Sequence, residues 1–301
     1  MTPDPTQHVF GPVPSRRLGR SLGVDLVPFK VCSFDCLYCQ LGRTTTLTTE
    51  RRQWVPTAEV IHQVEEALRG GERPDHVTLA GSGEPTLHEA LGEVIAGIKS
   101  LTDVPVAILT NGSLLWRGDV RADCARADVI LPTLASVDEA TQQRIHRPAE
   151  GLTHERHVEG LTRLREGFPG QIWLEVFLVG GINTAPEQIE GLRRIAERVR
   201  ADRIQLNTSA RPPADPEAHT LSGAELDRLA ALFGPGTEVV AQRPGKAIPL
   251  RAGVTADILL QVLQRHPSTA AELAAGLGVD AVQVDSLLRE LSEQGRVIAM
   301  P

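Results

Sequence analysis

Strand-like and helix-like segments alternate along most of the chain, and this alternation is the feature that most constrains its fold. The helix-like segments carry apolar residues three or four positions apart, as at Val60, Ile61, Val64 and Leu68, which is the spacing of an amphipathic helix. Between them lie short, mostly apolar runs, as expected of buried strands. These runs span residues 21–27, 76–80, 105–109, 129–131, 171–179 and 203–207. Strands joined by helices predict a parallel sheet with right-handed crossovers.

The segment before the first strand is rich in proline and glycine. Residues 8–20 therefore predict a lead-in without regular structure. Arg16, Arg17 and Arg20 concentrate positive charge there. These arginines could meet an anionic substrate or a cofactor carboxylate, or they could form a solvated basic turn. The sequence leaves both interpretations open.

Three cysteines lie close together just after the first strand-like run. Cys32, Cys36 and Cys39 have the spacing C-x3-C-x2-C. Three thiolates on one loop can hold three irons of a cubane iron–sulfur cluster and leave the fourth iron open for chemistry. Structural zinc is the alternative, although it takes a fourth Cys or His ligand and the remaining cysteine, Cys124, is isolated in the sequence. A disulfide framework suits short secreted chains, whereas this chain has 301 residues and four cysteines.

The cysteine loop resembles the signature of the radical S-adenosylmethionine (radical SAM) superfamily, because its spacing matches and the aromatic Tyr38 directly precedes the third cysteine. The resemblance implies that Cys32, Cys36 and Cys39 bind a [4Fe–4S] cluster whose fourth iron binds the amino and carboxyl groups of S-adenosyl-L-methionine (SAM). An electron from the cluster then cleaves the sulfonium to methionine and a 5′-deoxyadenosyl radical, which removes a hydrogen from the substrate. A flavodoxin- or ferredoxin-type electron donor is also implied.

The resemblance extends to the fold class. It implies an α/β protein with a partial (β/α)6 barrel of the TIM type. The six strand-like runs fit that count, since a closed TIM barrel has eight. We therefore expect an oxidoreductase-type, metal-binding radical SAM enzyme.

Polar or glycine-containing segments follow several of the strand-like runs, where the active site of an α/β barrel lies. Residues 81–85 (Gly-Ser-Gly-Glu-Pro) resemble the family's Gly-Gly-Glu segment, which receives the methionine amino group. Residues 110–112 match the family's ending of the third strand, and the glycines of 180–183 suit close approach to adenine. Each motif could also be an ordinary turn. The residues implied as SAM contacts are Tyr38, Gly81, Ser82, Gly83, Glu84, Pro85, Asn111, Thr133, Gly181 and Asn207.

Two further polar residues lie among apolar neighbours. Glu175 alternates with apolar residues in the fifth strand-like run, so we expect it to face the barrel interior. A carboxylate there must be paired or bind a ligand, and a structural salt bridge is the ordinary alternative. His146 is expected to be structural rather than catalytic.

Residues 11–19 and 40–42 resemble the wyosine-type, tRNA-modifying subgroup of the superfamily. That subgroup has Ser-Leu-Asp at the end of the fourth strand, where this chain has Thr-Leu-Ala at 133–135, so the acid is absent. Archaeal members carry extra N-terminal cysteines for a second cluster, which this sequence lacks, and none of its three lysines is evidently placed to form an imine with pyruvate. The substrate class stays open between an RNA nucleoside and a peptide or protein side chain.

The last part of the chain resembles a winged-helix domain, with short helices followed by a strand-like run at 295–299. Six acidic residues against three arginines in 255–301 argue against DNA binding and favour protein or peptide docking. A cluster-containing regulator with this module as its output is the alternative. The expected domains are a radical SAM barrel over 1–233, a linker with a short strand over 234–254 and the winged-helix-like domain over 255–301.

Charge and hydropathy exclude other classes of protein. A net charge of −7 argues against a broad nucleic-acid-binding surface. The N-terminus lacks the basic start and apolar run of a signal peptide, and no apolar stretch approaches the ~20 residues that span a bilayer. We therefore expect a cytoplasmic protein without a membrane partner, in a compartment where thiols stay reduced.

Overall fold

One curved, mostly parallel sheet organises the computed structural model, which describes residues 6–70, 73–209, 217–240, 254–265, 268–277 and 279–298. Its strand order is β1-β2-β5-β6-β7-β8-β9-β10. Only β1 runs antiparallel to its neighbour, and every other adjacent pair is parallel. The strands are β1 (Val9–Ser15), β2 (Gly19–Val24), β5 (His76–Leu79), β6 (Val106–Thr110), β7 (Val129–Leu134), β8 (Gln171–Leu178), β9 (Arg203–Thr208) and β10 (Glu238–Val239). A separate parallel pair is formed by β3 (Val31–Cys32) and β4 (Thr46–Leu47).

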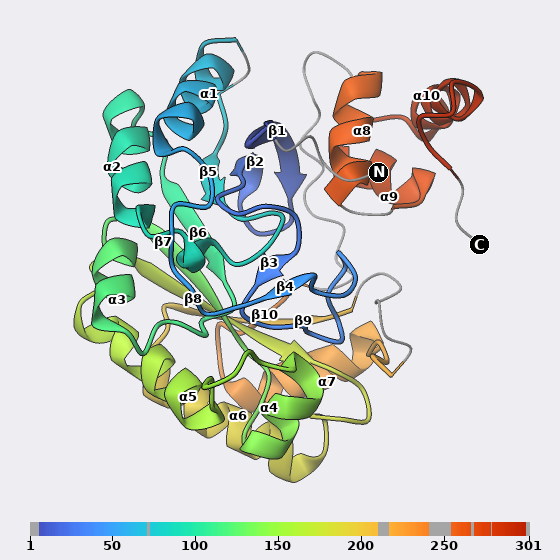
Figure 1. Ribbon diagram of the computed structural model, residues 1–301. Coiled ribbons are helices and arrows are strands. Elements are labelled where there is room, and N and C mark those ends of the chain that lie inside the picture. Colours follow the sequence, from blue (N-terminus) through green and yellow to red (C-terminus); the bar gives the residue numbers. More distant parts are fainter. Residues whose placement is uncertain are drawn as a thin grey trace.

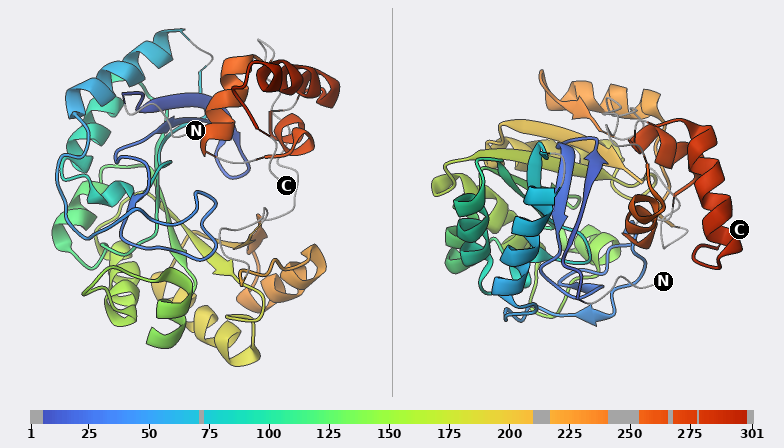
Figure 2. Two further views of the ribbon diagram at one scale, coloured as in Figure 1. Left: turned by 45° about the vertical axis from the view of Figure 1, so that its right-hand side comes forward. Right: turned by 90° about the horizontal axis from the view of Figure 1, so that it is seen from above.

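Helices cover the outer side of the sheet (Figures 1 and 2). They are α1 (Thr57–Gly70), α2 (Leu91–Leu101), α3 (Gly118–Cys124), α4 (Glu139–His146), α5 (His154–Arg163), α6 (Pro186–Val199) and α7 (Gly223–Phe233), with short 3-10 turns at Pro85–Leu87 and Leu164–Glu166. Strand residues alternate between two environments, as a pleated strand requires. In β8, Leu174 and Val176 join the outer core with the helices, whereas Trp173 and Phe177 belong to separate inner clusters.

The predicted parallel sheet is confirmed, since β2 and β5 to β9 coincide with the six strand-like runs. The prediction of an irregular lead-in is wrong, because Val9–Ser15 forms β1 and pairs with β2 from Val9↔Val24 to Ser15↔Gly19. The register shifts between Phe10 and Val13. Proline is tolerated in an edge strand or at a bulge, where its missing N–H breaks no ladder hydrogen bond, so the prolines that suggested a loop fit this strand.

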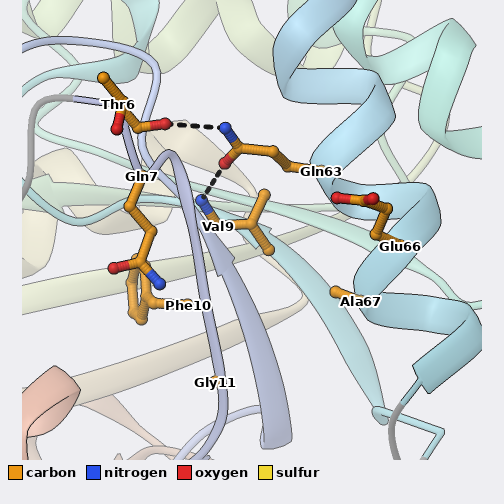
Figure 3. A pocket seen from close by; sticks show the side chains of 8 residues that line it. All are labelled: Thr6, Gln7, Val9, Phe10, Gly11, Gln63, Glu66 and Ala67. Atoms are coloured by element: carbon orange, nitrogen blue, oxygen red, sulfur yellow. Dashed lines mark hydrogen bonds between the residues drawn. The ribbon is translucent and has the colours of Figure 1, made fainter. Parts of the chain in front are cut away.

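The edge strand is also tied to α1. Gln63 Oε1 accepts hydrogen bonds from the N–H groups of His8 and Val9, and its Nε2 donates to the carbonyl of Thr6 (Figure 3). A surface pocket of about 410 Å³ lies beside this contact, and its lining includes no cysteine. The pocket is lined by Thr6, Gln7, Val9, Phe10, Gly11, Gln63, Glu66 and Ala67.

Three helices follow the barrel: α8 (Ala256–Arg265), α9 (Ala270–Leu277) and α10 (Ala281–Glu293). They share an apolar cluster of their own, and α8 and α9 also contact β1 (Figure 1). Residues 295–298 lie outside any strand, and Ala299, the last residue of the predicted strand, lies outside the described residues. The short strand predicted before these helices is confirmed as β10, which extends the barrel sheet beside β9. Within the described part of the chain, none of the helices has the length and apolar character needed to cross a lipid bilayer.

Candidate functional site

The three clustered cysteines lie on a loop that crosses the carboxyl ends of the strands. Beside β5, the N–H of Lys30 donates to Ser82 and the N–H of Glu84 donates to Val31. The last carbonyls of α4 also accept hydrogen bonds from the loop, at Ile145 and His146. Carbonyls at a helix end lack partners within the helix, so the loop satisfies them while α4 holds the loop in place.

Cys32, Cys36 and Cys39 are half-buried, and protein atoms surround the thiols of Cys32 and Cys36. Burial, with the charge of Glu84 adding to it, raises the pKa of Cys32 to about 12. Burial also raises the pKa of Cys36 well above its ordinary value, and the Lys30 charge lowers both pKa values in part. Because metals bind the thiolate and release its proton, these thiols stay protonated until a metal replaces the proton.

Each of the three cysteine sulfurs has at least one polar side chain within hydrogen-bond distance, and Cys36 also interacts with the Tyr38 hydroxyl. The other three partners come from the cysteine loop itself, the end of β6 and the end of α4. The pairs are Lys30 Nζ with Cys39 Sγ (3.3 Å), Asn111 Nδ2 with Cys32 Sγ (3.6 Å) and His146 Nδ1 with Cys36 Sγ (3.2 Å). Hydrogen-bond donors around sulfur stabilise a thiolate and tune a bound cluster.

Glu84 is a fully buried carboxylate that joins the ends of β5 and β6. Its Oε1 accepts hydrogen bonds from the N–H and hydroxyl of Thr86 and from the hydroxyl of Thr110, and its Oε2 accepts one from the N–H of Asn111. Burial raises the pKa of Glu84, and these hydrogen bonds oppose the rise. Among the described residues, Oε2 accepts from Asn111 alone, so this oxygen keeps acceptor capacity for a ligand ammonium.

The glycines at the end of β5 allow close packing within the protein. A Cβ on Gly81 would lie 2.0 Å from Asp25 Oδ1, and one on Gly83 would lie 1.9 Å from the carbonyl oxygen of Val31. Gly81 also has φ +138°, which side chains disfavour. The N–H of Ser82 donates to Asp25, a buried residue that the sequence did not single out. What these glycines approach is therefore Asp25 and the cysteine loop.

Tyr38 joins the cysteine loop to β8. Its ring stacks on that of Phe177 with 3.8 Å between centroids, beside the buried side chains of Ala135, Ile145 and Val179. Burial raises the pKa of Tyr38 well above its ordinary value, so the phenol is neutral. The contact forms an apolar wall next to the cysteine sulfurs.

Glu175 faces the barrel interior, and its partner is an arginine of the β1–β2 turn. Arg17 donates to Oε1 at 2.8 Å, Asn207 donates to the same oxygen at 3.0 Å and Thr133 donates to Oε2 at 2.7 Å. The salt-bridge interpretation of Glu175 is thus confirmed. Thr133 and Asn207, both implied as SAM contacts, meet on this carboxylate. Arg20, which lies in β2 just after this turn, pairs with Asp75.

The segment after β8 contains a buried asparagine, Asn183, and an exposed glycine, Gly181. Asn183 Nδ2 donates to the carbonyls of Ala135 and Phe177, and its Oδ1 accepts from the N–H of Val179. Asn183 therefore ties the ends of β7 and β8 together. Gly181 is exposed, with φ +75° and nothing near its missing Cβ, so its glycine identity follows from the turn. Pro85 opens the buried 3-10 turn after Glu84.

Two contacts of the cysteine sulfurs were not predicted from the sequence, namely Lys30 with Cys39 and His146 with Cys36. His146 was expected to be structural, and it is fully buried, yet it also contacts Cys36. For Lys30 a signal existed, since a lysine in an otherwise apolar run two positions before Cys32 is unusual for a strand end. Cys124 lies in the outer core on α3, where burial raises its thiol pKa, as its isolation in the sequence suggested.

Comparison with known proteins decides the family. The model of the radical SAM superfamily matches residues 26–196. A UPF0026 protein of Methanocaldococcus jannaschii is 31% identical over 298 residues, covering 97% of this chain and 92% of that protein. The chain belongs to the radical SAM superfamily, within the UPF0026 family. Enzymes of this superfamily use a [4Fe–4S] cluster and SAM.

Two other similarities are more limited. One is to part of a larger protein, and the other is a similarity of fold alone. A protein of Brachyspira hyodysenteriae named GTPase Obg is 36% identical over 97% of this chain, but the chain spans only 43% of that protein. The radical SAM fold is similar to a solved structure of TYW1 with a lysine–pyruvate adduct bound, with a TM-score of 0.51, 18% identity, and coverage of 71% of this chain and 72% of that chain.

The site has the donor set that the radical SAM cofactors require. Three thiols on one loop match the number of irons that protein ligates in such a cluster, and the sulfurs have a cation and two further polar groups beside them. Glu84 Oε2 adds an acceptor for an amino group. In number and chemical type these residues fit a [4Fe–4S] cluster and SAM, whereas no three His, Cys, Asp or Glu side chains of the described residues gather closely enough to share a single metal ion.

Proposed function

We propose that Cys32, Cys36 and Cys39 bind the cluster of this radical SAM enzyme and that the strand ends around them bind SAM. When bound, the cluster supplies the electron that cleaves the SAM sulfonium to methionine and a 5′-deoxyadenosyl radical, which takes a hydrogen from the substrate. The observation that carries the proposal is the meeting of the cysteine loop with the polar ends of β5 and β6, through Ser82 and Glu84 beside Lys30 and Val31.

In this proposal, different residues of the chain contact different parts of SAM. Glu84 Oε2 accepts the methionine ammonium, and the backbone of 81–83 lines the approach to it. Asn111 links Glu84 to Cys32, so cofactor and cluster share one support. While they donate to Glu175, the Thr133 hydroxyl can still accept a hydrogen bond from SAM and the Asn207 amide can still donate its second hydrogen. The exposed position of Gly181 suits the outer edge of the adenine site.

Anaerobic reconstitution tests this assignment. We expect about four iron and four sulfide per chain, and release of 5′-deoxyadenosine and methionine after reduction with SAM present. The Cys32→Ala, Cys36→Ala and Cys39→Ala variants should each lose the cluster and the cleavage. Cys124→Ala is the matched control and should keep both. Bound zinc without SAM cleavage, or loss of iron from Cys124→Ala, would overturn the assignment.

For the substrate we propose a nucleoside of tRNA. The support is the resemblance of residues 11–19 and 40–42 to the wyosine-type subgroup. Condensation of pyruvate through a lysine imine is not part of the proposal. Of the lysines that the structure describes, Lys30 bonds to Cys39 and Lys99 pairs with Asp128.

Substrate-stimulated SAM cleavage tests the nucleoside. Bulk tRNA should increase 5′-deoxyadenosine formation by the reconstituted enzyme, and mass spectrometry of the digested tRNA should reveal a new nucleoside. Stimulation by a peptide pool and not by tRNA would instead favour the second candidate, modification of a peptide or protein. The acidic α10, with Asp285, Glu290 and Glu293, is the observation that favours that candidate.

The helices α8, α9 and α10 follow the barrel in the sequence. We infer a docking domain of winged-helix type over 255–301 and the radical SAM barrel over 1–233, with β10 continuing the barrel sheet from within the proposed 234–254 linker. The separate apolar cluster of α8, α9 and α10 supports an independent unit. A flavodoxin- or ferredoxin-type protein is the proposed electron donor, and an unchanged rate of SAM cleavage when such a donor replaces a chemical reductant would support it.

A further inference from the structure

Lys30 is a buried cation that points at the cysteine loop. Its residue is 3% exposed. In the part of the chain that the structure describes, its ammonium bonds to Cys39 Sγ at 3.3 Å and to the carbonyl of Gly42, and forms no ion pair with a carboxylate. A buried ammonium is costly unless negative charge lies close to it. The cysteine thiolates and what they bind can supply this charge at contact distance, as the bond to Cys39 shows.

The position of Lys30 is set by its backbone. Its φ is +64°, in the left-handed region that costs energy for a residue with a side chain. Its N–H donates to the carbonyl of Ser82 at 2.7 Å, and its carbonyl accepts from the N–H groups of Thr45 and Thr46. The backbone of the lysine is thereby held between the end of β5 and the far side of the cysteine loop, so its side chain starts from a fixed position beside the cysteines.

A second cation on the same loop provides a contrast. Arg43 carries the same charge, but its side chain is 68% exposed and it faces Asp35 at 3.4 Å. Water and a carboxylate both screen that charge. Lys30 is 3% exposed and, among the residues that the structure describes, faces no carboxylate in an ion pair.

Resting on the proposed cysteine ligands, we propose that Lys30 is the internal counter-ion of the iron–sulfur cluster and raises its reduction potential. Reduction transfers one electron from an external one-electron donor, which is oxidised, and requires no proton or leaving group. The cysteine site becomes more negative by that electron. A fixed cation in a low-dielectric setting stabilises the reduced form more than the oxidised form, so Lys30 makes the cluster easier to reduce.

The test is a potentiometric titration of the reconstituted, SAM-free protein with dithionite, followed by EPR of the reduced cluster. Removing the charge in Lys30→Gln should lower the equilibrium constant for reduction at least about tenfold, which is about 59 mV for a one-electron couple. Lys30→Arg, which keeps the charge, should stay closer to wild type. The matched control Arg43→Gln, which removes a screened charge from the same loop, should change the constant less than about twofold.

The outcomes are separable from those of the proposed function. If the wild-type protein forms no cluster, the proposed cysteine assignment fails before any variant is compared. If Lys30→Gln holds a full cluster with an unchanged potential, the counter-ion role is refuted while the cysteine assignment stands. If Lys30→Gln holds no cluster, the Lys30→Arg variant decides between the two roles. A Lys30→Arg protein that holds the cluster at the wild-type potential supports the need for a positive charge. A Lys30→Arg protein that also lacks the cluster shows instead that Lys30 maintains the shape of the loop.

Discussion

The imidazole Nδ1 of His146 lies 3.2 Å from the sulfur of Cys36, although the two residues are 110 positions apart. The ring stacks on Phe34 with 4.6 Å between centroids. Burial holds the pKa of His146 well below its usual value, so the ring is neutral. When Cys36 is a thiolate, which only accepts hydrogen bonds, this contact requires Nδ1 to donate its proton toward the sulfur.

Replacing His146 with Phe keeps a ring over Phe34 and removes the donor to Cys36. We expect the variant to keep its full iron content, because the three thiols remain. The equilibrium constant for cluster reduction should fall severalfold, less than in Lys30→Gln, because a neutral dipole stabilises added charge less than a cation does. Iron analysis and potentiometry check this expectation. A variant with little iron would show instead that His146 holds the loop in place.

Glu84→Gln should destabilise the iron-free protein by about 2–3 kcal/mol. The amide cannot accept all the hydrogen bonds that the carboxylate receives from Thr86, Thr110 and Asn111, and buried donors to a charged group are costly to leave unpaired. Urea unfolding measures the loss. The control Glu93→Gln, on the exposed side of α2, should change stability by less than about 0.5 kcal/mol. Equal small effects in both variants would contradict the buried role of Glu84.

Arg17→Met should destabilise the barrel by about 3 kcal/mol, because it leaves the Glu175 carboxylate inside the protein without its cation. Adding Glu175→Gln should recover at least half of this loss, since a neutral amide no longer needs a cation. The exposed pair of Arg73 with Asp103 provides the comparison, and Arg73→Met should have no measurable effect. Thermal or urea unfolding of the set checks this. A double variant no more stable than Arg17→Met would mean that packing, rather than charge, dominates.

Acidification below neutral pH should destabilise the protein partly through His157. Burial lowers the pKa of His157 from 6.5 to about 4 in the folded state. Its contribution is therefore fully present above pH 6.5 and is lost as pH falls toward 4, because the unfolded chain takes up the proton first. We expect a loss of about 2 kcal/mol between pH 7 and pH 5 from this residue.

His157→Gln isolates that contribution. Glutamine can still donate to the carbonyl of Asn111, which His157 Nε2 contacts at 3.0 Å, but it does not titrate. The stability of the variant should fall less between pH 7 and pH 5 than that of the wild type. Glu84, whose raised pKa acts in the opposite direction, is present in both proteins and cancels in the comparison. Parallel pH curves would refute the assignment.

Much of the barrel could be predicted because its signals are local. The apolar spacing of α1 and α6 and the apolar runs of β7 and β8 depend on periodicity alone. Strand β1 escaped prediction because its prolines match a loop pattern, and only pairing with β2 across a shifted register makes Val9–Ser15 a strand. Helix α4 was also missed, since its Asp138 cap precedes a polar helix with little apolar periodicity.

By itself, the sequence determined the class of the protein: the cysteine spacing, the alternation of strands and helices, and the glycine and polar residues at the strand ends are all encoded within short segments. Only the tertiary structure showed which side chains contact the cysteine sulfurs and the buried carboxylate of Glu175. Lys30 at Cys39, His146 at Cys36, and Arg17 at Glu175 are contacts created by the packing of the loop and the curvature of the sheet. The physical reason is that burial turns an ordinary side chain into one that must be paired, and which partner is within reach depends on distances through space rather than on spacing along the chain.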